Sequence, residues 1–467
     1  MAPAVKSLRS FTLSKLEGHF AGALPARLFP KAKSKDNSRD RLYTQRRTFW
    51  CFLWQCLTPN TSCRQVVRQV QALCKLFGGP QVSEEDGAYC RARLRLPAAL
   101  LPQALAATAR EVQRRAPSCD FLQARPVRVM DGSSVTMPDS PANQKACPKV
   151  QSTYDGGGFP MLRLVVLFCL TSGAMVSMLS GNLLTSELCL LHQLLAQFKA
   201  GDIALGDRGF GNYVVVGLLR AIQVDFIGRS ARKVDGRRRQ RRLGRNDWLV
   251  QWRRSPNPSA ILSPEQWGQI PKELTVRIVR GSLWQPGFRV RQVTLVTTLL
   301  DPTLYPAGQI LRADARRWRL EMCLDDLKTT LGMEMLRCQS PAMVQKEVYL
   351  YLIAHNLIRL LMAQAASAHG QPLERMSFKG TLDALRPFSQ AICQARSQRK
   401  GRELWDELLR TLAADLLPER PGRREPRAVK RQKNKYPRLD RPRDKFRDHP
   451  KRHVRRQKAR LRNASLK

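Results

Sequence analysis

Hydrophobic positions in the first quarter of the chain recur at intervals of three and four residues. Phe49, Phe52, Leu53 and Leu57 follow this spacing, which places apolar side chains on one face of a helix. Proline and glycine interrupt the pattern, and Ser62 is suited to cap the second helix. The predicted helices are 47–58, 63–77, one from about 83, and 97–115. We interpret this segment as an all-helical domain. It either places one helix in a DNA major groove or serves as a scaffold with solvated arginines.

Short apolar runs replace the helical period after residue 125. The expected strands are 127–130, 162–170, 174–179, 203–206 and 224–227, and the expected helices are 187–198 and 213–222. Strands that alternate with helices predict an α/β fold with a mixed sheet, and the ribonuclease-H-like fold has this order of elements. The most apolar stretch, 161–179, contains Arg163 and a turn at Thr171-Ser172-Gly173, so it predicts a hairpin rather than a membrane span.

The rest of the chain departs from this alternation. Patterns at 274–280 and 288–300 predict a β-rich insertion, and the helix that carries Glu321 is expected to begin near Ala313. Further helices are expected over 344–363, 387–396 and 404–417. The predicted organisation is a flexible basic arm (1–40), a helical DNA-binding domain (41–124), the first part of a ribonuclease-H-like core (125–228), the β-rich insertion (229–312), the second part of the core (313–365), C-terminal helices (366–418) and a basic disordered tail (419–467).

The net charge of the chain indicates the kind of partner that it binds. The 467 residues include 81 Lys and Arg against 37 Asp and Glu, a formal net charge of +44. Each phosphate that such a protein neutralises releases counterions, so the composition favours nucleic acid. The tail, with 21 Lys and Arg against 5 Asp and Glu, is expected to bind DNA of any sequence. A basic RNA-associated protein is a further alternative.

Cysteine usage and the N-terminus add little that is specific. The 12 cysteines form no CxxC pair, and the nearest cluster, Cys51, Cys56 and Cys63, has no histidine beside it. We therefore expect no zinc site, and reduced thiols in the core of a cytoplasmic protein. The N-terminus shows no apolar segment typical of a secretory signal, and no membrane partner is expected.

Two aspartates follow apolar strands. Asp131 comes after 127–130 and precedes Gly132, and Asp207 comes after 203–206 and precedes Arg208-Gly209. At the carboxyl end of a strand an aspartate can face the crevice where ligands gather, although Asp-Gly also caps ordinary turns. The repetition of the arrangement favours a functional site.

A third carboxylate lies on a later helix. Arg317, Glu321 and Lys328 are spaced by four and seven, so they are expected to share one helix face. Such a face suits a metal ligand flanked by phosphate-binding cations, but it is also an ordinary exposed Arg–Glu pair with a spare lysine. Asp325 has the same periodicity and ranks lower. Three converging carboxylates would bind Mg²⁺, and a pair of such ions can promote in-line displacement at a phosphodiester.

Four tryptophans in the insertion lie among arginines. One could stack on an extruded base, but such side chains more often fill a small β core. They are Trp248, Trp252, Trp267 and Trp284.

The blocks around these acids resemble the insertion-sequence transposases of the IS-four family. Residues 131–139, with Pro141-Ala142-Asn143, resemble its first-aspartate block, and residues 205–210 resemble its second. The third block in that family reads Tyr, two residues, Arg, three residues, Glu, six residues, Lys (the YREK signature). Arg317, Glu321 and Lys328 match it, whereas Asp314 stands at the tyrosine position. The similarity covers about 45–365.

The resemblance implies a DDE transposase that moves a DNA element by cutting and pasting. Asp131, Asp207 and Glu321 would hold two Mg²⁺ or Mn²⁺ ions, and Arg208, Arg317 and Lys328 would contact DNA. Water would cut a strand at the element end, and the freed 3′-OH, often after forming a hairpin, would join target DNA. The partners implied are terminal inverted repeats, target DNA and a second copy of the chain, in the bacterial cytoplasm at the nucleoid.

Asp314 supports an alternative function. A carboxylate at the tyrosine position is expected to repel the DNA backbone. The alternative is therefore a catalytically impaired or domesticated sequence-specific DNA-binding protein of the same fold.

Overall fold

A computed structural model describes residues 19–20, 22–29, 42–76, 78–116, 120–148, 159–230, 239–259, 262–283 and 291–418. The predicted basic tail and most of the predicted N-terminal arm lie outside these residues, as does Trp284. The helices are α3 (Gln45–Leu57), α4 (Cys63–Leu76), α5 (Gly87–Arg95), α6 (Leu100–Arg115), α7 (Pro141–Ala146), α8 (Glu187–Leu194), α9 (Tyr213–Ala221), α10 (Pro264–Gln269), α11 (Ala307–Asp325), α12 (Pro341–Ala368), α13 (Phe378–Gln394) and α14 (Gln398–Ala414). The strands are β1 (Val127–Thr136), β2 (Met161–Cys169), β3 (Met175–Asn182), β4 (Ile203–Gly206), β5 (Asp225–Arg229), β6 (Arg239–Gly244), β7 (Asp247–Arg253), β8 (Glu273–Leu283) and β9 (Arg291–Thr297).

The nine strands of the described residues belong to one mixed sheet in the order β3-β2-β1-β4-β5-β9-β8-β7-β6. β1, β4 and β5 are parallel, whereas β2 and β3 form the predicted antiparallel hairpin beside β1. The first five strands have the order and directions of the ribonuclease-H-like fold, which confirms the predicted fold class. Parallel neighbours need crossover helices, and α8 and α9 supply them on one face.

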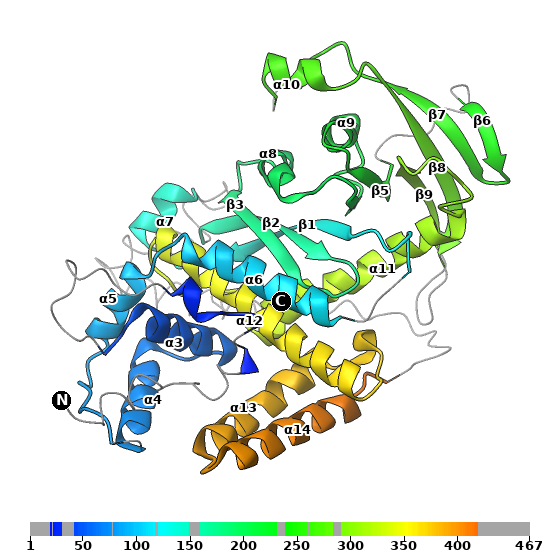
Figure 1. Cartoon of the computed structure of the whole chain (residues 1–467). Coiled ribbons are helices and arrows are strands. Elements are labelled where there is room, and N and C mark those ends of the chain that lie inside the picture. The colour runs from blue at the N-terminus through cyan, green and yellow to red at the C-terminus, as the bar shows by residue number, and fades with distance from the viewer. Residues whose placement is uncertain are drawn as a thin grey trace, which may run out of the picture.

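The two faces of this sheet carry different helices. Val129, Leu205 and Ile227 belong to one core cluster with α6 and α12, while Met130, Ala204 and Phe226 belong to a second cluster with α8 and α9. Alternate residues along each strand thus enter opposite cores. Figure 1 shows α8 and α9 on one side of the sheet and α6, α11 and α12 on the other.

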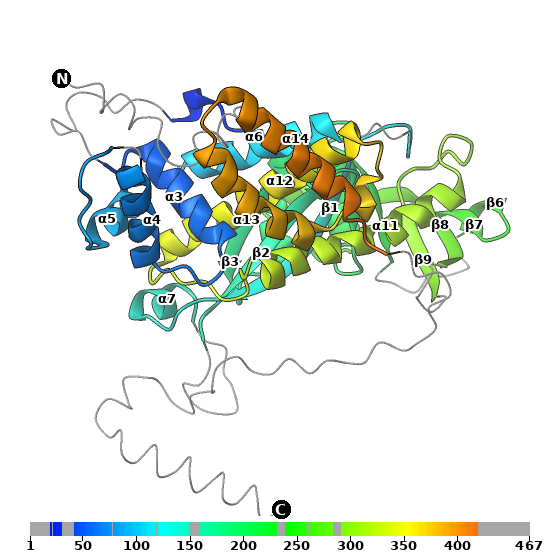
Figure 2. The same ribbon diagram turned by 90° about the horizontal axis from the view of Figure 1, so that it is seen from below.

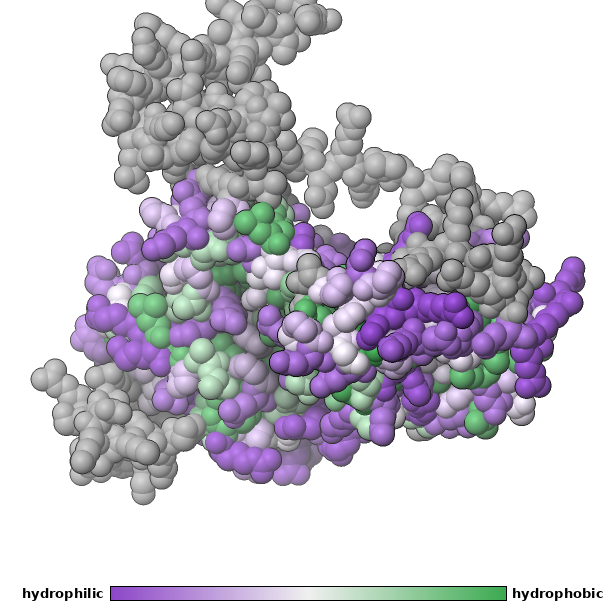
Figure 3. Space-filling model, turned by 90° about the horizontal axis from the view of Figure 1, so that it is seen from above, coloured by the Kyte–Doolittle hydropathy of each residue, from purple (hydrophilic) through white to green (hydrophobic). Residues whose placement is uncertain are grey.

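The insertion does not form a separate sheet. β9 pairs antiparallel with β5, so β9, β8, β7 and β6 extend the core sheet. The β-rich character was predicted, but β6 and β7 were not, because the arginines of β6 obscure the alternation of a strand. At this end of the molecule hydrophilic side chains dominate the surface in Figure 3, and Arg241, Arg242 and Arg245 are exposed there.

The helical segments before and after the sheet share its core. α3 and α6 pack against α12, and α13 and α14 cover α12 from the far side (Figure 2). α4 and α5 instead belong to a small separate cluster of eight buried residues around Tyr89 and Val67. One described helix, α12, is long and apolar enough to cross a membrane, but 83% of its most apolar window is buried inside the protein. It is therefore interpreted as the central core helix.

Several predicted boundaries are wrong. For example, α14 begins at Gln398 rather than at residue 404, because Ser397 caps it. β1 does not end at Asp131 but continues to Thr136, because the whole strand pairs with β2. α11 begins at Ala307 rather than near Ala313, since the helix starts directly after Pro306 and buries Ile310 in its first turn. α13 begins at Phe378 and contains Pro387, because Ser377 caps it ten residues before the proline expected to start it.

Candidate active site

The strand register brings Asp131 and Asp207 together. β1 and β4 are parallel, and their last paired residues are Met130 and Gly206. The next residue on each strand is an aspartate, so the two acids occupy the same level on neighbouring chains. Parallel strands lie about 4.8 Å apart, which is a spacing that allows two carboxylates to share a metal site.

Both aspartates are assigned to the same face by alternation. Val129 on β1 and Leu205 on β4 enter the core shared with α12, and the acids lie two residues further along each strand. A period of two puts Asp131 and Asp207 on that face, which is also the face of α11.

Local packing shapes the end of β4. A Cβ on Gly206 would lie 2.8 Å from Cβ of Phe210, so a larger residue there would displace the turn that follows Asp207. The Asp207 carboxylate accepts a 2.8 Å hydrogen bond from the Gly209 amide, which holds this turn. Asp207 is half-buried and Arg208 is exposed. The strand thus delivers an accessible acid beside an accessible cation.

α11 carries the third acid across this face. It packs against β4, β5 and β8, and Leu311 fits so closely over Gly281 that a Cβ there would lie 2.4 Å away. Ile310, Asp314 and Leu324 mark the buried stripe of the helix, and position 321 falls on the same stripe. The backbone of Glu321 is therefore placed on the sheet side of α11, while its side chain lies outside the described part of the structure.

The lysine of the third block approaches the first aspartate. Burial lowers the pKa of the Lys328 ammonium, while the nearby carboxylates of Glu334 and Asp131 act in the opposite direction. Lys328 lies not on α11 itself but in the π-helical turn Asp326–Thr330, so the predicted continuous α-helical face is interrupted after Asp325. The chain then returns to pair Met335 with Thr136 at the end of β1, which fixes this turn beside Asp131.

Comparison with known proteins shows the family of the chain. The family model described as "Transposase DDE domain" matches residues 122–357, which is half of the chain. The chain belongs to the DDE transposases. The transposase InsG for insertion sequence element IS4 of Escherichia coli (strain K12) is 25% identical over 395 residues, which cover 83% of this chain and 85% of that protein. A cryo-EM structure of the piggyBac transposase synaptic complex with hairpin DNA aligns with 90% of this chain and 86% of its own, with 8% identity and a TM-score of 0.39.

This DDE transposase replaces the family's tyrosine by a buried ion pair. The Asp314 side chain has no exposed surface, and its Oδ2 accepts hydrogen bonds from Nη2 and Nε of Arg229 at 2.9 and 3.2 Å. Nε of Arg317 lies 3.6 Å from Asp314 Oδ1. The expectation that Asp314 repels the DNA backbone is wrong, because the carboxylate faces two arginines inside the protein. It instead fastens α11 to β5.

The same contacts change the picture of Arg317. Arg317 is only 8% exposed, and its guanidinium lies against Asp314. Arg208 and Lys328 are more accessible than Arg317. Arg229, the residue that neutralises Asp314, was missed from the sequence because it lies 85 residues away and in no recognised block.

The family's first block has a structural role beyond its aspartate. Nδ2 of the buried Asn143 donates to the carbonyl oxygens of Pro138 and Cys338 at 3.1 and 3.2 Å. Ser140 Oγ donates to the Gln339 carbonyl at 2.6 Å. These bonds tie α7 to the segment that follows Lys328, so the block helps to hold the lysine near Asp131.

Further carboxylates lie around the site without joining it. Glu187, at the start of α8, lies over Gly132, where a Cβ would be 2.7 Å from its carboxyl carbon, but alternation puts Gly132 on the opposite face from Asp131. Asp325 is exposed and accepts a hydrogen bond from Thr329 at 2.9 Å. Burial raises the pKa of the Asp326 carboxyl to about 7.

The tryptophans of the insertion mostly fill its core. Trp248 and Trp267 are buried in the cluster on the α9 face, and Trp252 packs against it. Arg280 lies 5.0 Å from the Trp248 ring centre, and Arg254 lies 5.0 Å from that of Trp267. The packing interpretation therefore holds for these described tryptophans.

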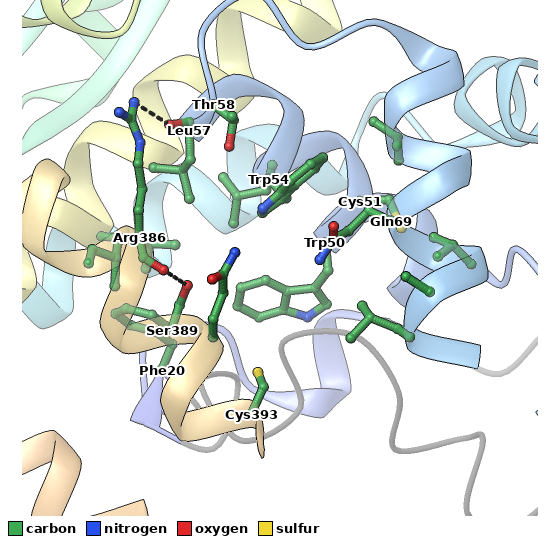
Figure 4. Close-up of a pocket in the computed structure, with 18 of the residues that line it drawn as sticks. Phe20, Trp50, Cys51, Trp54, Leu57, Thr58, Gln69, Arg386, Ser389 and Cys393 are labelled. Atoms are coloured by element: carbon green, nitrogen blue, oxygen red, sulfur yellow. Dashed lines mark hydrogen bonds between the residues drawn. The ribbon is translucent and has the colours of Figure 1, made fainter. Parts of the chain in front are cut away.

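A cavity of about 410 Å³ lies elsewhere, between α3, α4 and α13. Trp50, Trp54 and Arg386 line it, and Figure 4 shows Arg386 donating to the Leu57 carbonyl at its rim. Neither Asp131 nor Asp207 lines it. A DNA duplex needs an open face rather than such a cavity, so the two features are separate.

Proposed function

We propose that Asp131, Asp207 and Glu321 together hold two divalent metal ions, Mg²⁺ or Mn²⁺, and that this site performs cut-and-paste transposition. The observation that supports the proposal is the parallel register of β1 and β4, whose last paired residues, Met130 and Gly206, directly precede the two aspartates. All three donors are carboxylate oxygens, which suit hard ions of this kind. When bound, such ions activate the attacking hydroxyl and offset charge on the leaving oxygen.

The protein side chains orient the phosphodiester in this scheme. The two aspartates fix one edge of the site, because each is anchored at the same level of a rigid parallel pair. Lys328, next to Asp131, would compensate phosphate charge, and the exposed Arg208 would hold the strand beside Asp207. A phosphate contact by Arg317 requires that its guanidinium turn away from Asp314.

The reaction then proceeds in two displacements. Water attacks the phosphorus at the element end, the new O–P bond forms, and the bond to the 3′ oxygen breaks and leaves a 3′-OH. This hydroxyl next attacks a phosphodiester and joins the element strand to a new partner. Both steps are in-line displacements at phosphorus, so one set of carboxylates serves both.

The substrate and assembly belong to the same proposal. We infer that the DNA bound is the pair of terminal inverted repeats and then target DNA, with one chain at each end in a homodimer. The net charge of +44 supports work at the bacterial nucleoid in the cytoplasm. Analytical ultracentrifugation with end DNA tests the dimer, since a complex with a single chain would contradict it.

Three single variants test the site. Asp131→Asn, Asp207→Asn and Glu321→Gln are each expected to bind the DNA ends flanking the gene but to lose cleavage by roughly 10²–10³-fold or more. Cleavage is measured with labelled end DNA in Mg²⁺, and binding by anisotropy in Ca²⁺. Asp325→Asn is the matched control, because Asp325 is an exposed acid one helical turn after Glu321. This variant should cleave DNA normally.

The outcome separates the alternatives. Normal cleavage by any of the three variants would remove that acid from the site. A wild-type chain that binds ends but cuts none, with either metal, would support the impaired DNA-binding protein. The sequence feature that favoured that alternative, Asp314, no longer does so, because its charge is neutralised by Arg229.

A further inference from the structure

Two thiols and a carboxylate meet between α4 and α5, away from the sheet. Cys63 is the first residue of α4, Asp86 is the N-cap of α5, and Cys90 lies in the first turns of α5. One ligand atom from each lies within 4.8 Å of the other two. All three residues are partly buried, and both cysteines are free. Sequence reasoning grouped Cys63 with Cys51 and Cys56, but the fold places it beside residues 23 and 27 positions further along the chain.

Asp86 does not perform the usual task of an N-cap. Its side chain makes no capping hydrogen bond to α5. By contrast Ser62, the residue before α4, accepts a 3.2 Å bond from the Gln65 amide, and Asn212 accepts a 3.1 Å bond from the Val215 amide. The Asp86 carboxylate lies by the two sulfurs instead. Caps of this type normally stabilise a helix, so the departure points to another role.

A cationic side chain lies beside the two cysteines. Arg93, one turn after Cys90, interacts electrostatically with both Cys63 and Cys90. Its guanidinium lies 4.8 Å from the Phe52 ring centre and donates to Gln55 Oε1 at 3.4 Å, which holds it in place. The first turns of α4 and α5 add the positive ends of two helix dipoles.

We propose that Cys63, Asp86 and Cys90 bind one zinc ion that joins α4 to α5, with water as the fourth ligand. Thiolate sulfur selects zinc over the hard ions that suit the three-carboxylate site. Two thiolates and one carboxylate around a divalent ion leave one negative charge, which Arg93 offsets. Binding releases the two thiol protons.

The site would stabilise a part of the protein with little core of its own. In the small cluster of eight buried residues, α4 contributes four and α5 two, and the other two are Tyr43 and Cys51, whereas most buried residues of α3 and α6 belong to the large core. A small core gains most from a metal cross-link. The zinc ion would therefore fix the orientation of two basic helices within the predicted DNA-binding domain. This inference stands independently of the catalytic proposal.

Cobalt titration of the full-length, reduced, metal-free chain tests the site. Binding of Co²⁺ by two thiolates gives a sulfur-to-cobalt charge-transfer absorption that carboxylate sites do not produce. We expect this band to saturate at one Co²⁺ per chain and to be displaced by Zn²⁺. Cys63→Ser and Cys90→Ser should abolish it, and Asp86→Asn should weaken binding about tenfold.

Two further variants keep the test decisive. Cys189→Ser, which removes a partly buried thiol on α8, should leave the band unchanged. Cys90→His retains a ligand at the same place and should bind Co²⁺ with a weaker band. The proposal is overturned if the wild-type chain shows no thiolate band, if Cys189→Ser loses it equally, or if the purified chain carries a Cys63–Cys90 disulfide and takes up no metal after reduction.

Discussion

The half of the sheet that carries Asp131 and Asp207 differs from the insertion half in strand direction, burial and charge. β1, β4 and β5 are parallel, and β4 is buried along its whole length. β9, β8, β7 and β6 are antiparallel, and the outermost strand presents exposed Arg241 and Arg242. One hydrogen-bonded sheet thus combines a rigid support for carboxylates with a cationic edge.

Two arginines, the partly buried Arg229 and the fully buried Arg277, connect the halves to α11 and to the loop before it. Arg229 on β5 binds Asp314 in the middle of the helix. Arg277 on β8 is fully buried, donates to Asp247 at 2.8 Å and to the Tyr305 carbonyl at 2.7 Å, and so holds the loop before the helix. The insertion therefore also helps to hold α11, the helix that carries Glu321, in position.

Removal of the Arg277 contacts is expected to have the largest effect on stability. Arg277→Met leaves the Asp247 carboxylate buried without its partner, so the free energy of unfolding should fall by about 3–5 kcal/mol. Urea unfolding measures this. Arg280→Met on the same strand is the control, because Arg280 is exposed over Trp248 and should cost about 1 kcal/mol or less. If both variants lowered the free energy of unfolding equally, the buried contacts of Arg277 would not be the cause of the loss.

Asp314 tests the second link. Asp314→Asn should lower the free energy of unfolding by about 1–3 kcal/mol, because a buried charged acceptor of Arg229 is weakened. Cleavage should fall as well, since α11 is held less firmly on β5. Asp314→Tyr restores the residue of the family signature. It should lower stability and cleavage more than Asp314→Asn does, because the buried space around Asp314 is already filled. A tyrosine variant with more than wild-type activity would show that Asp314 disturbs the site rather than supporting it.

The cationic edge should affect binding but not chemistry. Arg241→Gln with Arg242→Gln is expected to weaken DNA binding similarly on all sequences and to reduce the salt slope by up to about 2. Anisotropy titrations at several salt concentrations measure the slope, with single-turnover cleavage of bound ends as the second readout. An unchanged slope would remove β6 from the DNA-binding surface, whereas slower cleavage of fully bound ends would assign it a catalytic role.

The smallest expected effect is a pH dependence near the π-helical turn. Burial raises the pKa of Asp326 to about 7, and Asp325 adds to the shift while Arg359 opposes it. The folded chain then holds a proton that the unfolded chain has already lost above about pH 4, so stability declines as the pH rises towards 7. Asp326→Asn should flatten this part of the profile. Urea midpoints between pH 5 and 8 measure it, and a parallel decline in both proteins would assign it to other groups.

The secondary structure of the core was largely predictable, because apolar runs and helical spacing are local properties. The strand 203–206, the hairpin and helices α8 and α9 were all expected from the pattern. β1 was predicted too short, because its second half is mostly polar. No local pattern in the sequence reveals that this half pairs with β2. β6 was missed because it is an edge strand rich in arginine, which hides the alternation of a strand, and β7, which pairs with β6 and β8, was not predicted either.

The residue types of the candidate site could be proposed from the sequence alone: two aspartates that follow apolar runs, a glutamate and a lysine at the spacing of the third block, and a basic chain suited to DNA. Only the tertiary structure decided how they relate. The parallel register places Asp131 level with Asp207, the π-helical turn brings Lys328 to Asp131, and Arg229 converts Asp314 from an apparent defect into a buried anchor. These relations join residues tens of positions apart. They depend on strand pairing and burial, which are properties of the whole fold rather than of any local stretch of sequence.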